Sequence, residues 1–167
     1  MEIINKVAQS GIVSIDLEEF FPVEPVLVFD LKDYLFRGLI LREKDFREAM
    51  AATDWSQYSN KYLAVDCTAD AIIPNWAYML VAVYAQPYAI EVLMGSAETA
   101  IKKIYAEKLL KIDIEQYRGR RIVVKGCSDK PVPVDAYLDI TRLLKPVAKS
   151  IMYGEPCSTV PIYKKTN

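Results

Sequence analysis

The sequence of 167 residues contains no histidine. Histidine is the most common general base near neutral pH and the most common transition-metal ligand. Its absence excludes the Ser-His and Cys-His pairs that activate nucleophiles in many hydrolases. Acid–base chemistry therefore has to use carboxylate, lysine, tyrosine or cysteine groups, and a metal would need Cys, Asp, Glu or backbone ligands.

The chain also lacks an excess of charge and a long apolar run. It has 21 basic and 22 acidic residues, a formal net charge of −1, which gives no electrostatic case for binding nucleic acid or an anionic membrane. The longest apolar run, Trp76 to Ala85, is half of the roughly 20 residues that span a bilayer. The N-terminus does not read as a signal peptide. We expect a cytoplasmic protein with neither nucleic acid nor membrane as a partner.

The composition, 52% hydrophobic and 26% charged, is typical of a globular chain, and the length suits one domain over 1–167. We expect an irregular strand, helix and loop extension over 1–60 and a regular β-α-β-α-β-α-β part over 61–167. This alternation predicts an α/β fold with a mainly parallel or mixed sheet flanked by helices. Strands are predicted over 26–30, 62–66, 90–94, 122–125 and 160–163, and helices over 42–53, 75–85 and 96–110.

Three further stretches carry specific expectations. The helix over 75–85 is apolar almost all round, which predicts deep burial. A last helix is expected to start at Pro133, to continue through Ile151 with a kink at Pro146, and to stop at Gly154. Residues 14–20 fit either a helix capped by Ser14 or a strand with alternating apolar residues.

Two segments of the chain resemble each other. Each has a strand, a cysteine followed by a hydroxyl residue, a proline and then an Ala-Tyr pair on a helix. The match covers fewer than 20 residues and needs a one-residue gap, so it does not establish a duplication, and no period of 20–50 residues indicates a solenoid. The paired residues are Cys67-Thr68, Pro74 and Ala77-Tyr78 in the first segment, and Cys127-Ser128, Pro133 and Ala136-Tyr137 in the second.

The three cysteines are the candidate metal ligands. In a parallel sheet Cys67 and Cys127 would follow the carboxyl ends of strands, where open α/β sheets bind ligands, and a turn could bring Cys157 to the same edge. Three thiolates and a fourth ligand would suit zinc or an iron–sulfur cluster. The spacings of 60 and 30 residues match no zinc-finger or ferredoxin pattern. Two alternatives stay open: inert core cysteines, and thiols for redox or sulfur-transfer chemistry.

Thr68, Ser128 and Lys130 are the candidate cofactor-binding residues. They precede predicted helix N-termini, whose free N–H groups favour anions, so they could serve an enzyme that binds a small anionic ligand at the strand ends. The alternative is that the hydroxyls only cap helices. A third class is a homodimeric interaction module, with a contact surface of exposed aromatic side chains: Tyr34, Trp55 and Tyr58.

Several motifs of the chain are distinctive when taken together. They include Phe29-Asp30-Leu31-Lys32-Asp33, Asp54-Trp55-Ser56-Gln57-Tyr58, Ile73-Pro74-Asn75-Trp76-Ala77-Tyr78, Lys125-Gly126-Cys127-Ser128 and Gly154-Glu155-Pro156-Cys157-Ser158-Thr159. With these motifs the chain resembles, over nearly its whole length, a bacterial family of unknown function, domain-of-unknown-function family 2480. The resemblance implies a stand-alone cytosolic protein and, through neighbouring genes, iron–sulfur assembly proteins as partners; it implies no activity, cofactor or catalytic residue. It favours the metal or sulfur interpretation of the cysteines.

Overall fold

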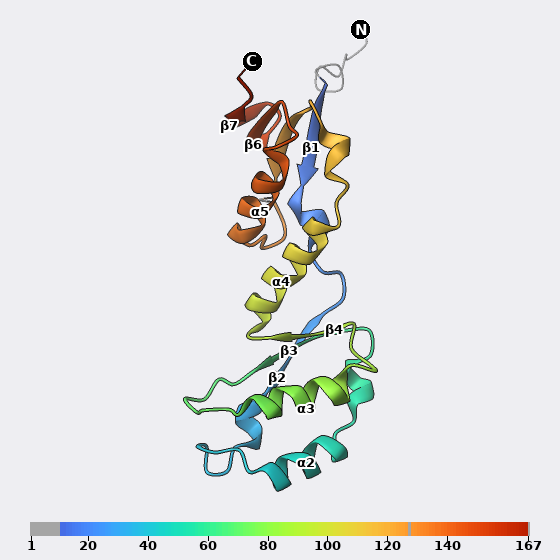
Figure 1. The fold of residues 1–167 in the computed structure, drawn as a ribbon, viewed down its shortest axis with the longest axis vertical. Helices are drawn as coiled ribbons and strands as arrows, with labels where there is room; N and C mark the ends of the chain where they lie inside the picture. Colours follow the sequence, from blue (N-terminus) through green and yellow to red (C-terminus); the bar gives the residue numbers. More distant parts are fainter. Residues whose placement is uncertain (1–10, 127, 167) are drawn as a thin grey trace. The chain divides into compact units, whose positions relative to one another are not determined.

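A computed structural model describes residues 11–126 and 128–166 (Figure 1). The chain divides into two compact units: unit 1 holds the residues up to Phe21 and those from Ile104 onward, and unit 2 is Pro22–Lys103. The predicted α/β class is confirmed, because helices alternate with strands in two mainly parallel sheets. The single domain over 1–167 stays a prediction. No helix in the described part of the chain is long and apolar enough to cross a membrane.

Unit 2 contains a sheet of three parallel strands in the order β2-β3-β4. Both of its complete helices pack against one face of this sheet, because their buried residues share one apolar cluster with alternate residues of the strands. The elements are β2 (Val26–Asp30), the 3-10 turn η2 (Leu31–Tyr34), α2 (Glu43–Ala52), the 3-10 turn η3 (Trp55–Tyr58), β3 (Tyr62–Asp66), α3 (Asn75–Ala85) and β4 (Glu91–Met94).

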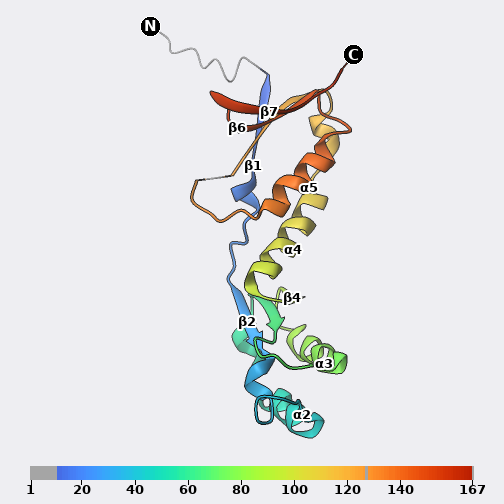
Figure 2. The same cartoon turned by 90° about the vertical axis from the view of Figure 1, so that its left-hand side faces the viewer.

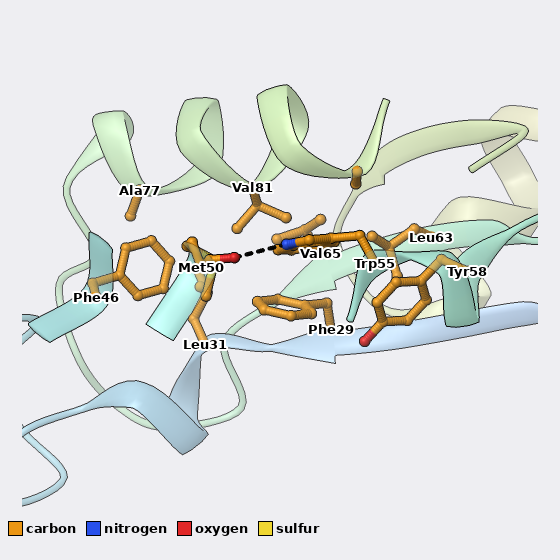
Figure 3. Packing of buried hydrophobic residues seen from close by; sticks show 11 residues of the cluster. Phe29, Leu31, Phe46, Met50, Trp55, Tyr58, Leu63, Val65, Ala77 and Val81 are labelled. Atoms are coloured by element: carbon orange, nitrogen blue, oxygen red, sulfur yellow. Dashed lines mark hydrogen bonds between the residues drawn. The ribbon is translucent and has the colours of Figure 1, made fainter. Parts of the chain in front are cut away.

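Aromatic side chains form the centre of the unit 2 core (Figure 3). The Trp55 ring stacks on Phe29 at 5.2 Å between centroids, and its indole N–H donates to the Met50 carbonyl at 2.8 Å. Only 5% of Trp55 and 9% of Tyr58 remain exposed. The expectation that these two aromatics form a contact surface is therefore wrong, because residues 55–58 form a 3-10 turn that directs them into the core.

The expected deep burial of α3 is also wrong. Ala77, Val81 and Ala85 are buried on one face, but Met79 and Val83 are 67% and 69% exposed. The helix has the predicted bounds, and its composition carries no amphipathic signal because apolar residues occupy both the inner and the outer face. Helix α3 therefore exposes apolar side chains on its outer face.

Unit 1 contains a four-stranded sheet in the order β1-β5-β6-β7. The first three strands are parallel, and β7 pairs antiparallel with β6 at the edge of the sheet, a place that tolerates Pro161 because proline cannot donate to a ladder. Figure 2 shows α5 along one side of this sheet. The elements are β1 (Ile12–Asp16), the 3-10 turn η1 (Leu17–Phe20), α4 (Ala97–Leu110, shared with unit 2 up to Lys103), the 3-10 turn η4 (Ile114–Tyr117), β5 (Arg121–Lys125), α5 (Val134–Leu144), β6 (Ser150–Glu155) and β7 (Ser158–Lys164).

The last predicted helix is too long. Helix α5 ends at Leu144, whose carbonyl accepts hydrogen bonds from the N–H groups of Val147 and Ala148 in a closing turn. Pro146 has no N–H to continue the helix. Ser150–Glu155 form strand β6 beside β5. The sequence predicts a helix for the first two of these residues, Ser150 and Ile151.

The two units repeat one arrangement of elements. In each, a strand and a 3-10 turn are followed by a helical segment, a second 3-10 turn, a strand, a helix that begins directly after a proline, and a further parallel strand. From η3 to the end of β4, each helix and strand of unit 2 begins 59 residues before its counterpart in unit 1. At this spacing Cys67 corresponds to Gly126, so the pairing of Cys67 with Cys127, which needs a gap, is not part of the structural repeat. Matching pairs include Asp54 and Asp113, Tyr58 and Tyr117, Pro74 and Pro133, Pro87 and Pro146, and Gly95 and Gly154.

Candidate functional pocket

A pocket of unit 1 lies between α5 and the β6–β7 side of the sheet. Its volume is about 750 Å³, within the range of small-molecule sites. Its walls are mainly apolar, and its polar groups gather in the loop that follows β5. The lining residues used below are Ser128, Asp129 and Lys130 of that loop, Tyr137 and Thr141 of α5, and Tyr153 of β6.

A buried carboxylate holds the polar loop of the pocket in place. Oε1 of Glu18, only 8% exposed, accepts hydrogen bonds from the N–H of Ser128 at 2.5 Å, from its hydroxyl at 2.9 Å and from the N–H of Asp129 at 3.0 Å. Burial by itself would raise the pKa of Glu18, but these bonds and one from the Lys130 backbone outweigh it and lower the pKa. The loop donors that could hold an anion are therefore already used by a carboxylate of the same chain.

The aromatic side of the pocket is packed against a glycine. A Cβ on Gly126 would lie 2.8 Å from the hydroxyl oxygen of Tyr137, so a side chain at this position would require the Tyr137 ring to shift. The ring of Tyr137 meets that of Tyr153 edge to face, with centroids 5.8 Å apart. These contacts fix two aromatic rings from α5 and β6 at the pocket wall.

A smaller polar pocket of about 200 Å³ adjoins the first and shares Gly126, Ser128 and Tyr153 with it. It lies at the carboxyl ends of β1, β5 and β6. Here the Lys125 ammonium lies 3.9 Å from Asp16 and 3.7 Å from Glu155. The charge of Lys125 is thus shared between two carboxylates, and this pocket offers no uncompensated positive charge.

Lys130 differs from Lys125 in its surroundings. Its ammonium lies 5.9 Å from the centre of the Phe21 ring, and no ion pair joins it to a carboxylate among the described residues. Among the described residues that line the pocket of about 750 Å³, Lys130 is the only lysine or arginine, which makes its ammonium the group to test for contact with an anionic ligand.

The structure places two of the three predicted cofactor-binding residues, Ser128 and Lys130, in one pocket, and Thr68 in unit 2. Thr68 repeats the pattern of Ser128: its N–H and hydroxyl donate to Asp30 at 3.1 and 2.5 Å. Burial would raise the pKa of Asp30, but the bonds from Thr68 and Lys32 lower it. Both hydroxyl residues therefore anchor a loop to a carboxylate at or just after the end of the neighbouring strand. Thr68 donates to Asp30 at the end of β2, and Ser128 donates to Glu18 in the turn after β1.

The two cysteines among the described residues lie in separate units. Cys67 is half-buried after β3 in unit 2, where its thiol lies 3.7 Å from the carbonyl oxygen of Ala69, and Cys157 is exposed in the turn between β6 and β7 of unit 1. Cys127 lies outside the described residues. Within 11–126 and 128–166, no three Cys, Asp or Glu residues form a group that could hold a metal ion.

Sequence reasoning missed Glu18, Tyr137 and Thr141. Glu18 reads as an ordinary acid in the first turn of a helix, and its partner Ser128 lies 110 residues further along the chain. In the sequence, Tyr137 stands out only as part of the Ala-Tyr match. Its equivalence to Tyr78, in a helix that begins directly after a proline, is the signal that could have drawn attention to this wall of the pocket.

The fold and the pocket define an α/β protein built from two units of similar design, one of which carries a cavity of ligand size. The chain belongs to the family described as Protein of unknown function (DUF2480), whose model matches residues 1–165. No curated protein and no solved structure matches the chain.

Proposed function

We propose that unit 1 binds a small molecule with an apolar, ring-sized body and one anionic group. The observation that carries this proposal is the pocket of about 750 Å³ beneath α5, with two tyrosine rings in its wall and Lys130 at its polar end. The body would lie against Tyr137 and Tyr153, and the anionic group would pair with the Lys130 ammonium. The loop N–H groups take no part, because Glu18 accepts from them.

The probe 8-anilinonaphthalene-1-sulfonate has this chemistry, an aromatic body with one negative charge. We expect its fluorescence to rise on binding with a stoichiometry of one per chain. Thr141→Trp, which fills the pocket from α5, should abolish the rise. Leu138→Trp is the matched control, because Leu138 lies on the same helix, is 70% exposed and does not line the pocket.

The charge is tested separately. Lys130→Ala should weaken binding of the probe by about tenfold, the effect of losing about 1.4 kcal/mol from one charge-assisted contact. Lys44→Ala, on the exposed side of α2 in unit 2, should leave it unchanged. Binding that survives Thr141→Trp in a protein with unchanged circular dichroism would overturn the proposal.

A metal or sulfur-handling role through Cys67, Cys127 and Cys157 is the second candidate. It is supported by the two free thiols among the described residues, one of them exposed. Zinc or an iron–sulfur cluster would bind thiolates in this role, and iron–sulfur assembly proteins would be the partners. Metal analysis of anaerobically purified protein tests it: wild type should carry metal that Cys127→Ser loses, and metal-free wild type would exclude it.

A further inference from the structure

The edge strand β4 of unit 2 is open where its counterpart in unit 1 is covered. Strand β6, which occupies the equivalent place 59 residues later, pairs with the antiparallel strand β7. Among the described residues no strand pairs with the outer edge of β4 (Figure 1). An uncovered edge strand offers a row of backbone groups for pairing with another chain.

A groove of about 400 Å³ lies beside this edge. It is bounded by Ala82 and Gln86 of α3 and by the residues that lead into and form β4, including Ile90 and Val92. Ile90 and Met94 are 46% and 50% exposed. The edge therefore combines open backbone groups with apolar side chains at both ends of the strand.

The sequence of β4 is complementary to itself. Ile90, Val92 and Met94 alternate along the chain and so point to one face of the sheet. If two copies pair antiparallel about a two-fold axis at Val92, the exposed Ile90 of each copy lies opposite the exposed Met94 of the other. Glu91 then lies opposite Leu93 rather than opposite a second Glu91, so no like charges face each other.

We propose that β4 is a homodimer interface, in which β4 of a second copy pairs antiparallel with it and joins two three-stranded sheets into one of six strands. The second copy takes the place that β7 takes in unit 1. A two-fold axis makes such an interface closed, which protects both edges at once. This surface is independent of the pocket beneath α5.

The mass of the wild-type chain in solution, measured by sedimentation over a range of concentrations, should be that of a dimer. Met94→Lys should give a monomer, because a lysine at an edge strand opposes pairing. Val28→Lys is the matched control. Val28 is 45% exposed on β2, the opposite edge strand of the same sheet, so the dimer should persist in this variant.

The register has its own test. Ile90→Glu alone should also give a monomer, and the double variant Ile90→Glu with Met94→Lys should regain the dimer, because the new carboxylate and ammonium would lie opposite each other. The regained dimer should weaken as salt is raised. A monomeric wild type, a dimer that survives Met94→Lys, or one that Val28→Lys disrupts equally would overturn the proposal. A monomer that captures a foreign strand at β4 would show a different occupant and would also overturn it.

Discussion

Glu18 and Ser128 lie 110 residues apart in sequence, yet one carboxylate oxygen of Glu18 accepts from both the backbone N–H and the hydroxyl of Ser128. The bonds join the turn after β1 to the loop after β5. Those two strands are neighbours in the sheet of unit 1, so the pair fastens the carboxyl edge on which the pocket depends.

Without the charge of Glu18, the melting temperature of the protein should fall less between neutral and acid pH. The folded-state pKa of Glu18 is lowered from 4.5, so its contribution is present above about pH 4.5 and is lost as pH falls through the folded-state pKa. Glu18→Gln should therefore be less stable than wild type at neutral pH, and the difference should shrink on acidification. Thermal melts from pH 3 to 7 measure this, with the exposed neighbour variant Glu19→Gln as the control.

Thr68→Val should destabilise unit 2 by about 1 kcal/mol, because it removes the hydroxyl that donates to Asp30 while keeping the side-chain shape. The N–H of residue 68 still donates to the same carboxylate, which limits the loss. Urea unfolding gives the free energy of unfolding. A variant as stable as wild type would show that the hydroxyl contributes nothing.

The hydroxyl of Tyr105 is buried and donates to the Leu17 carbonyl at 2.9 Å. Tyr105→Phe leaves this carbonyl without its partner and should cost about 1–3 kcal/mol in the free energy of unfolding. Burial raises the pKa of Tyr105 to about 12, above the ordinary 10.0. Its protonated form therefore stabilises the fold fully below pH 10, and this contribution is lost as pH rises toward 12.

An ultraviolet titration of tyrosine ionisation checks this value. Wild type should contain one tyrosine that ionises near pH 12 and that is missing from Tyr105→Phe. If the two proteins have the same titration curve, the hydroxyl of Tyr105 is not buried as described.

Alanine in place of Gly154, the second-to-last residue of β6, or of Gly95, which follows β4, should lower the free energy of unfolding. Gly154 has φ +110°, and a Cβ there would lie 2.8 Å from the backbone oxygen of Ser158. Its counterpart Gly95 has φ +111° with a Cβ position 3.0 Å from Thr99. Each substitution should cost about 1–3 kcal/mol for the strained backbone alone, with Gly154→Ala the worse because its neighbour is backbone. Gly119→Ala, at φ +69° in open space, is the milder control in urea unfolding.

Helices and strands whose ends are marked by nearby residues such as proline could be predicted from the sequence. Elements whose structure depends on contacts with distant residues could not. Strand 62–66 and helix 75–85 have the predicted bounds, because Pro74 and a β-type apolar run mark them. The sequence predicts a helix into the start of β6, because Leu144, Val147 and Ile151 continue a helical spacing beyond Pro146. Pairing with β5 and β7 decides the structure of that stretch, and a helical spacing does not reveal such pairing.

The site was predicted only in part for the same reason. Ser128 and Lys130 were identified because they lie in a loop ahead of a helix, a local signal. The walls of the pocket come from α5, β6 and β7, and the buried carboxylate comes from the turn after β1. These groups meet only when β1 and β5 pair, a contact between residues more than 100 positions apart.

The insertion of Pro22–Lys103 between β1 and the rest of unit 1 sets an order of events during synthesis. On the ribosome, β1 emerges first, but its partner β5 is made more than 100 residues later. Unit 2 is one continuous segment, so all of its strands and helices are synthesised before β5. The pairing of β1 with β5 closes a long loop, so we expect it to be a late step of folding. During synthesis Ile12–Asp16 therefore stays unpaired until β5 has been made, and we expect chaperones to have access to this strand of the nascent chain during that time.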